Sequence, residues 1–405
     1  MEEFNQINPD SIKNALTLRY DSTQKTLLPK LTWKDFIEKP VTTPVVHIEK
    51  TIRNTIKKKF GNSKLKVAVA LSGGIDSTLI LSLLRKTCPN LCIDAISVKF
   101  ADSIDESTHA AKIAERFEAD HHVIYIENYL KELPKAISII KLPFWDLHWY
   151  YVVKKTKSLS NTLVSGDGGD ELFGGYTFRY KKFLSLIKSN FSPTEKVKAY
   201  LTCHERDWVP DQEDLFGKKT HFSWNEIYNN LKPYFDNPLP SIAQVFLADF
   251  NGKLLYNWTP LNTKIHKHFG IRSVSPLLSK ELISYATHLP YQLKYDSKRD
   301  LGKILLRKIL RKYVSDSMIS RTKQGFSVNT INLLNSHGRE LCDYYLSDAR
   351  IIKEGWIKQD WIKKHLKKLG KEPDVRYVNK FFGLLAFEIW FRLFVTREIK
   401  PTTTL

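Results

Sequence analysis

Two short segments of the chain combine glycines with the polar side chains that bind phosphate and metal ions. The first, Leu71-Ser72-Gly73-Gly74-Ile75-Asp76-Ser77, lies between an apolar run at 65–71 and a helical pattern at 77–85. Glycines let the backbone approach a ligand closely, and the N–H groups at a helix start converge on an anion. We therefore predict that this segment binds the phosphates of a nucleotide.

This first segment is not a Walker loop, because the Lys-Ser/Thr pair is missing and Asp76 stands in its place. It resembles the Ser-Gly-Gly-x-Asp-Ser pyrophosphate loop of enzymes that cleave ATP to AMP and pyrophosphate. The simpler interpretation is a turn in which Asp76 or Ser77 caps the helix, but a cap needs only one such residue.

The second segment runs Ser165-Gly166-Asp167-Gly168-Gly169-Asp170-Glu171-Leu172-Phe173-Gly174-Gly175-Tyr176 and follows an apolar run at 162–165. Ligands of open α/β sheets bind at the carboxyl ends of the strands, so both segments should meet there. Magnesium bridging nucleotide phosphates needs carboxylate oxygens from the protein. We predict that Asp76 and Asp170 supply them.

The second segment also resembles the hallmark sequence of the asparagine synthetase family, which includes the β-lactam synthetases and lasso-peptide cyclases. Weaker matches follow in the family's order: Asp105-Glu106, Asp120-His121-His122, Gly302-Lys303 with Arg307, Arg321-Thr322-Lys323-Gln324-Gly325-Phe326, and 385–393 with Trp390. The resemblance extends over residues 46 to 395.

The resemblance implies an ATP-dependent and magnesium-dependent, AMP-forming ligase that adenylates a carboxylate for attack by ammonia or an amine. It assigns the pyrophosphate to Ser72, Gly73, Gly74 and Ser77, magnesium to Asp76 and Asp170, and further nucleotide contacts to Leu71, Val98, Gly166 and Asp167. Lys323 matches the family lysine that stabilises negative charge in the reaction. Lys303 matches a family lysine that lies near the phosphates. A surface position is the alternative for each lysine.

Two departures from the family bear on substrate and nitrogen donor. Glu2 stands where glutamine-dependent members carry a nucleophilic cysteine, so we expect no glutaminase within this chain. The family's Glu-Ala-Arg-Val-Pro-Phe-Leu-Asp motif is replaced by Arg272-Ser273-Val274-Ser275-Pro276-Leu277-Leu278-Ser279. Arg272 would then invert the charge presented to the incoming nitrogen, and an anionic substrate becomes a hypothesis.

Apolar runs at 65–71, 91–98, 122–126 and 162–165 alternate with helical patterns, which predicts an α/β fold with a doubly wound parallel sheet. The family resemblance implies the adenine nucleotide α-hydrolase-like (pyrophosphate-loop) type. We expect an N-terminal arm at 1–45 around a helix at 9–20, then one domain at 46–400. Its sheet core should occupy about 65–180 and a large helical part about 181–400, without further strands.

The bulk properties narrow the class of protein. The chain has no signal-like start and no apolar run long enough to span a bilayer, which favours a cytoplasmic protein with no membrane partner. Its four cysteines form no Cys-x-x-Cys pair, which argues against a zinc site. The net charge of +20 attracts polyanions in general but does not identify a particular one.

The partner we favour is a small-molecule or peptide carboxylate, with a separate glutaminase as an open alternative. RNA is open but not favoured, because thiolating pyrophosphate-loop enzymes that modify tRNA commonly need paired cysteines. A noncatalytic ATP-binding partner of a separate amidotransferase is the third alternative. The presence of Asp76, Asp170 and Lys323 together favours an enzyme.

Overall fold

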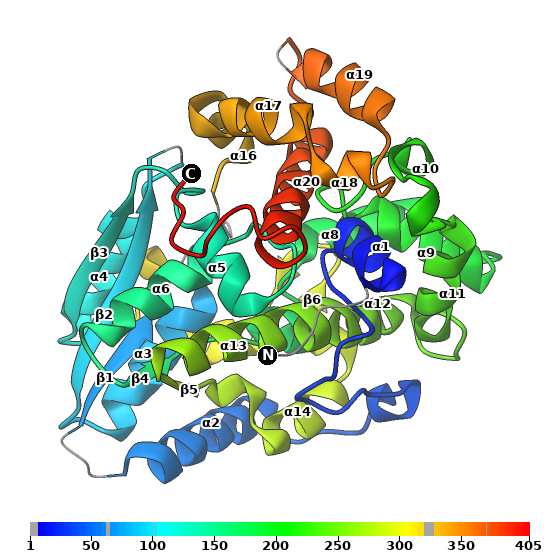
Figure 1. The fold of residues 1–405 in the computed structure, drawn as a ribbon. Helices are drawn as coiled ribbons and strands as arrows, with labels where there is room; N and C mark the ends of the chain where they lie inside the picture. Colours follow the sequence, from blue (N-terminus) through cyan, green and yellow to red (C-terminus); the bar gives the residue numbers. More distant parts are fainter. Residues whose placement is uncertain (1–6, 62–64, 102, 320–327, 370) are drawn as a thin grey trace.

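A computed structural model describes residues 7–61, 65–101, 103–319, 328–369 and 371–405. Its centre is a five-stranded parallel sheet in the order β3-β2-β1-β4-β5 (Figure 1). The strands are β1 (Lys66–Ala70), β2 (Cys92–Phe100), β3 (Asp120–Ile126), β4 (Thr162–Val164) and β5 (Arg272–Val274). The predicted doubly wound parallel sheet is confirmed.

The two faces of the sheet pack against different helices, because side chains alternate along each strand. Val67 and Val69 join the apolar core formed with α3 (Ile75–Thr87) and α4 (Ser107–Arg116). Ala68 and Ala70 join the core on the other face, formed with α5 (Leu133–Ile140) and α6 (His148–Lys157). The chain moves outward from β1 to β3 and then returns to β4, so right-handed crossovers place these helix pairs on opposite faces.

The fifth strand overturns the expectation that strands end near residue 180. β5 pairs in parallel with β4, with Thr162 opposite Arg272 and Val164 opposite Val274. It has three residues, and only Val274 is buried. So short and polar a strand leaves no alternating or apolar signal, and its place in the sheet depends on a partner far away in sequence.

The rest of the described chain is mainly helical, apart from the hairpin of β6 (Tyr295–Asp296) and β7 (Leu301–Gly302). The remaining α-helices are α2 (Pro44–Phe60), α7 (Gly169–Phe173), α8 (Thr177–Leu186), α9 (Pro193–Thr202), α10 (Gln212–Leu215), α11 (Trp224–Leu231), α12 (Ser241–Asp249), α13 (Thr259–Phe269), α14 (Lys280–Thr287), α15 (Ile304–Leu310), α16 (Thr330–Leu333), α17 (Arg339–Ser347), α18 (Arg350–Lys353), α19 (Gln359–Leu369) and α20 (Val375–Phe394). The helix α20 belongs to the core and is buried on nearly all sides. No helix in the described ranges is both long and apolar enough to cross a membrane.

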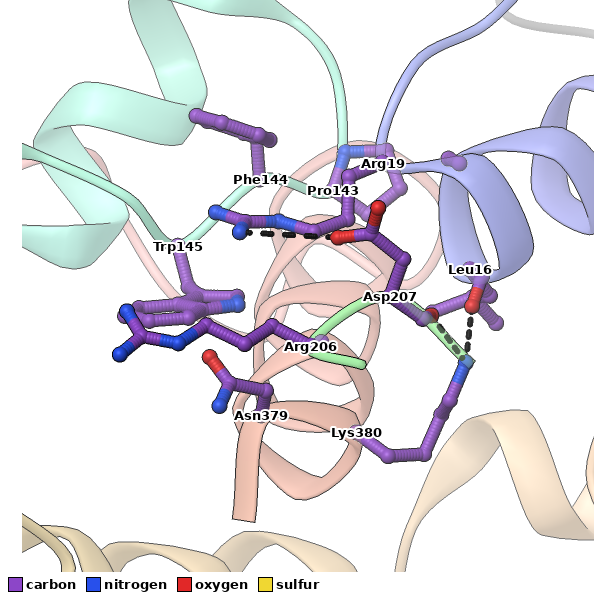
Figure 2. A pocket seen from close by; sticks show the side chains of 11 residues that line it. Leu16, Arg19, Pro143, Phe144, Trp145, Arg206, Asp207, Asn379 and Lys380 are labelled. Atoms are coloured by element: carbon purple, nitrogen blue, oxygen red, sulfur yellow. Dashed lines mark hydrogen bonds and ion pairs between the residues drawn. The ribbon is translucent and has the colours of Figure 1, made fainter. Parts of the chain in front are cut away.

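The N-terminal segment packs on this helical part. Its helix α1 (Pro9–Leu18) lies beside α20, where Lys380 Nζ donates hydrogen bonds to the carbonyl oxygens of Leu16 and Asp207, the latter at 3.0 Å (Figure 2). Arg19 forms an ion pair with Asp146 at 3.0 Å. These buried polar contacts fix the segment to the body of the protein.

Candidate functional site

The first glycine segment forms the loop between β1 and α3, at the carboxyl edge of the sheet. Gly73 has a φ of +73°, in the left-handed region that favours glycine, and Gly74 immediately precedes α3. The Ser77 hydroxyl accepts from the N–H of Ser72 at 3.3 Å and donates to the carbonyl of Gly74 at 3.2 Å. The loop thus folds back on the positive end of α3, which favours a bound anion.

The second glycine segment joins β4 to α7 and lies directly against the first loop. An added Cβ at Gly169 would lie 2.4 Å from Cγ of Asp76, and one at Gly166 would lie 2.8 Å from Cβ of Asp76. Neither position has room for a larger side chain. The glycines therefore let the two loops approach closely, as expected for neighbouring strands β1 and β4.

A buried lysine bridges the carboxylates of the two loops. Lys303 Nζ donates a hydrogen bond to Asp76 Oδ2 and lies 2.7 Å from Oδ1 of Asp170. Only 8% of its side chain is exposed. Burial by itself lowers the pKa of Lys303, but the charges of Asp170 and Asp76 outweigh it and raise the pKa above its usual value. The ammonium group therefore stays charged.

The backbone around Lys303 is held by close contacts with the second loop. Lys303 has a φ of +55°, an uncommon conformation for a residue with a side chain. An added Cβ at Gly302 would lie 2.0 Å from the carbonyl oxygen of Gly174, and one at Gly175 would lie 2.5 Å from Cε of Lys303. The β6–β7 hairpin thus holds Lys303 against the second glycine loop. An uncommon backbone conformation that is fixed by its surroundings in this way is frequent at functional sites.

Asp76 and Asp170 are suitable ligands for a magnesium ion that also binds phosphates. Both carboxylates reach the same Lys303 Nζ, so both face one small space. Within the described residues, no group of three or more His, Cys, Asp or Glu side chains could hold a metal ion. Magnesium usually takes one or two carboxylates and completes its shell with water and substrate phosphates. The donor set therefore fits magnesium bound together with a nucleotide.

Asp167 belongs to a separate polar cluster at the same edge of the sheet. Its Oδ2 accepts hydrogen bonds from the hydroxyls of Ser165 at 2.8 Å and Ser275 at 3.4 Å. Burial raises the pKa of Asp167, although these hydroxyls partly oppose the shift. Ser275 was not predicted from the sequence, because its position beside Asp167 depends on β5. A hydroxyl directly after a strand was the only available signal.

Arg272 lies at the amino-terminal ends of the strands, whereas both glycine loops follow the carboxyl-terminal ends. It is the first residue of β5, opposite Thr162, and its guanidinium carbon lies 5.8 Å from the ring centre of Phe60. Parallel strands present their ligand sites at their carboxyl ends. The expectation that Arg272 presents a charge to the incoming nitrogen is therefore wrong, and the anionic-substrate hypothesis loses that support.

The other predicted site residues differ in how directly they lie at the loops. Leu71 is fully buried and extends the β1 ladder, its N–H donating to Ile96 at 2.8 Å, so it offers a ligand only backbone groups. Val98 is buried in β2, two residues beyond Ile96 and towards the same edge. Lys323 lies outside the described residues.

Comparison with known proteins places these motifs in a family. The family model described as asparagine synthase matches residues 47–392. A curated relative, asparagine synthetase [glutamine-hydrolyzing] 1 of Bacillus subtilis, is 27% identical over 92% of this chain and 64% of its own length. A putative asparagine synthetase [glutamine-hydrolyzing] of Mycobacterium bovis is 23% identical over 85% of this chain and 57% of its own length. The chain thus spans about three fifths of these relatives.

Among solved structures, one match is the U34-tRNA thiolase NcsA from Methanococcus maripaludis with its [4Fe-4S] cluster. It is 16% identical, covers 50% of this chain and 76% of its own, and has a TM-score of 0.25. A similarity this low has no functional meaning for the present chain.

Proposed function

Because the chain belongs to the asparagine synthase family, we propose that it is an ATP-dependent, AMP-forming amide ligase. The observation that carries the proposal is the convergence of Asp76 and Asp170 on Lys303 beside a pyrophosphate-type loop. An anion-binding loop, two carboxylates able to bind a metal ion and a buried cation are together suited to bind a nucleoside triphosphate.

The reaction we propose has two steps. A carboxylate oxygen of the substrate attacks the α-phosphorus of ATP, a new P–O bond forms, and the bond between the α-phosphorus and the bridging oxygen breaks to release pyrophosphate. Ammonia or an amine then attacks the acyl carbon, loses a proton, and displaces AMP to leave an amide. The protein must stabilise the departing phosphate charge and hold both reactants in place.

In this proposal the first loop binds the leaving pyrophosphate. The backbone of Gly73 and Gly74, the hydroxyls of Ser72 and Ser77, and the N-terminus of α3 surround the anion. Leu71, Val98 and Gly166 contribute the adjoining walls of the nucleotide site.

Magnesium, when bound by Asp76 and Asp170, neutralises phosphate charge. Lys303 offsets part of the negative charge of these two carboxylates, and its ammonium group lies where it can also attract phosphate oxygens. Lys323 is proposed, from the family resemblance, as the second lysine that stabilises charge in the reaction.

The carboxylate substrate is proposed to bind next to the carboxyl ends of β4 and β5, near Asp167, Ser165 and Ser275. The three side chains already form a hydrogen-bonded cluster, with the two hydroxyls 3.0 Å apart. Hydroxyl groups can both donate to and accept from a polar substrate. A small molecule and a peptide both remain open as substrates, as do free ammonia, ammonia from a separate glutaminase, and an amine as nitrogen donors.

The test uses aspartate labelled with oxygen-18 in its carboxylates, together with ammonium, ATP and magnesium. Adenylation followed by amide formation transfers one labelled oxygen to AMP and yields asparagine. AMP without label, in the presence of asparagine, would contradict the adenylate. ATP binding with no turnover would instead reject aspartate and direct the search to other carboxylates.

A further inference from the structure

We propose that His109 is a phosphate-binding residue that donates a hydrogen bond to the pyrophosphate part of the nucleotide. The inference rests on the proposed nucleotide site and adds to it a residue from a different element. His109 lies in the first turn of α4, after β2, whereas the first glycine loop follows β1. The strands β1 and β2 are neighbours, so both segments emerge at the same edge of the sheet.

The imidazole of His109 lies directly on the glycine loop. An added Cβ at Gly73 would lie 2.8 Å from Cδ2 of His109 and 3.8 Å from the backbone nitrogen of Ala110. Nε2 is bonded to Cδ2, the ring atom nearest to Gly73, and so belongs to the edge of the imidazole that faces this loop. The absence of a side chain at Gly73 is therefore what allows the ring and the start of α4 to reach the anion-binding turn.

The Nε2 atom of His109 is buried and has no hydrogen-bond partner among the described residues. A buried polar atom without a partner is rare in proteins and calls for a specific explanation. A phosphate oxygen supplies the missing acceptor, either for the Nε2–H tautomer or for the imidazolium form. The unsatisfied nitrogen and the contact with Gly73 are independent observations that indicate the same ligand.

The acidic residues at the start of α4 do not exclude an anion from this place. Asp105 is paired with Lys99 at 2.8 Å and also accepts from the backbone N–H of Ser107. Burial raises the pKa of Glu106 to about 7, so near neutral pH part of this carboxyl population is uncharged. The N-terminus of α4 adds a favourable dipole for a phosphate.

The variant His109→Phe tests the proposal, because phenylalanine keeps a ring against Gly73 but lacks the nitrogen. Calorimetry would measure the binding of magnesium pyrophosphate, magnesium ATP and adenosine to each protein. Loss of one hydrogen bond to a charged group predicts that pyrophosphate and ATP bind about 10- to 100-fold more weakly, with adenosine unchanged. His109→Gln, whose amide nitrogen can take the position of Nε2, should recover most of the lost affinity.

His268→Phe is the matched control, since His268 is exposed on α13 and away from the glycine loops. Equal binding of pyrophosphate by wild type and His109→Phe would overturn the inference. An equal loss for adenosine would also overturn it, because a general disturbance of the site affects every ligand. If the wild-type protein bound no ATP, the proposed function itself would fail. That result differs from the two outcomes that overturn the role of His109 alone.

Discussion

Replacing Lys303 by methionine removes the cation that lies between Asp76 and Asp170 while keeping most of the side-chain volume. Its Nζ contacts both carboxylates, and its side chain is 8% exposed. Removing one partner of a buried ion pair costs about 3–5 kcal/mol, because the other charge is left uncompensated. We therefore expect the free energy of unfolding without magnesium to fall by about that range.

Urea unfolding followed by circular dichroism measures this loss. In the variant, mutual repulsion raises the carboxylate pKa values in the folded state, so stability should increase as the pH is lowered from about 7 to about 5 and one proton is taken up. Magnesium should stabilise the variant, because it can replace the missing cation. Lys308→Met, an exposed change on α15, which begins directly after Lys303, is the control and should behave as wild type. A loss below about 1 kcal/mol with no gain at lower pH would refute the proposed charge balance.

Three further changes test the contact between the glycine loops, the buried histidine His266 and the position of Arg272. Gly169→Ala should abolish ATP binding and lower stability by about 1–3 kcal/mol, because its Cβ would overlap Asp76; Gly383→Ala, with only an ordinary contact, should do neither. Burial lowers the pKa of His266 in the folded state to about 4. The neutral imidazole therefore contributes fully to stability at pH values above the pKa of the unfolded chain, and this contribution is lost as the pH falls towards about 4. Stability should therefore fall by about 3 kcal/mol between about pH 6.5 and 4, and His266→Gln should reduce that slope in urea titrations. Arg272→Glu should leave the rate of ATP cleavage unchanged, since Arg272 lies at the far edge of the sheet; a rate loss of about tenfold would contradict this placement.

The local sequence was sufficient to predict the contact between the two glycine loops. Each loop follows an apolar run, and such runs form adjacent buried strands whose carboxyl ends share one edge. The structure places Asp76 against Gly166 and Gly169, in agreement with that reasoning. The family resemblance indicated Lys303 as a lysine near the phosphates, but not that its ammonium group bridges two carboxylates, because that contact joins residues distant in sequence.

The errors arose where tertiary pairing decides the structure. β5 has a single buried residue, so no local pattern distinguishes it from a loop. The hypothesis for Arg272 came from its place in the family's acceptor motif, which does not reveal that Arg272 begins a strand, and Ser275 could not be recognised beside Asp167 without that strand. His109 was missed for a similar reason, because its significance lies in a contact with Gly73 rather than in a motif.

We propose that this site cleaves ATP between the α- and β-phosphates. Phosphorus-31 spectroscopy of the protein with ATP, magnesium, ammonium and a mixture of amino acids tests it most directly, with Asp76→Ala as the matched variant. The wild type should produce AMP and pyrophosphate, and Asp76→Ala should produce neither. Formation of ADP and inorganic phosphate, or equal turnover by Asp76→Ala, would contradict it.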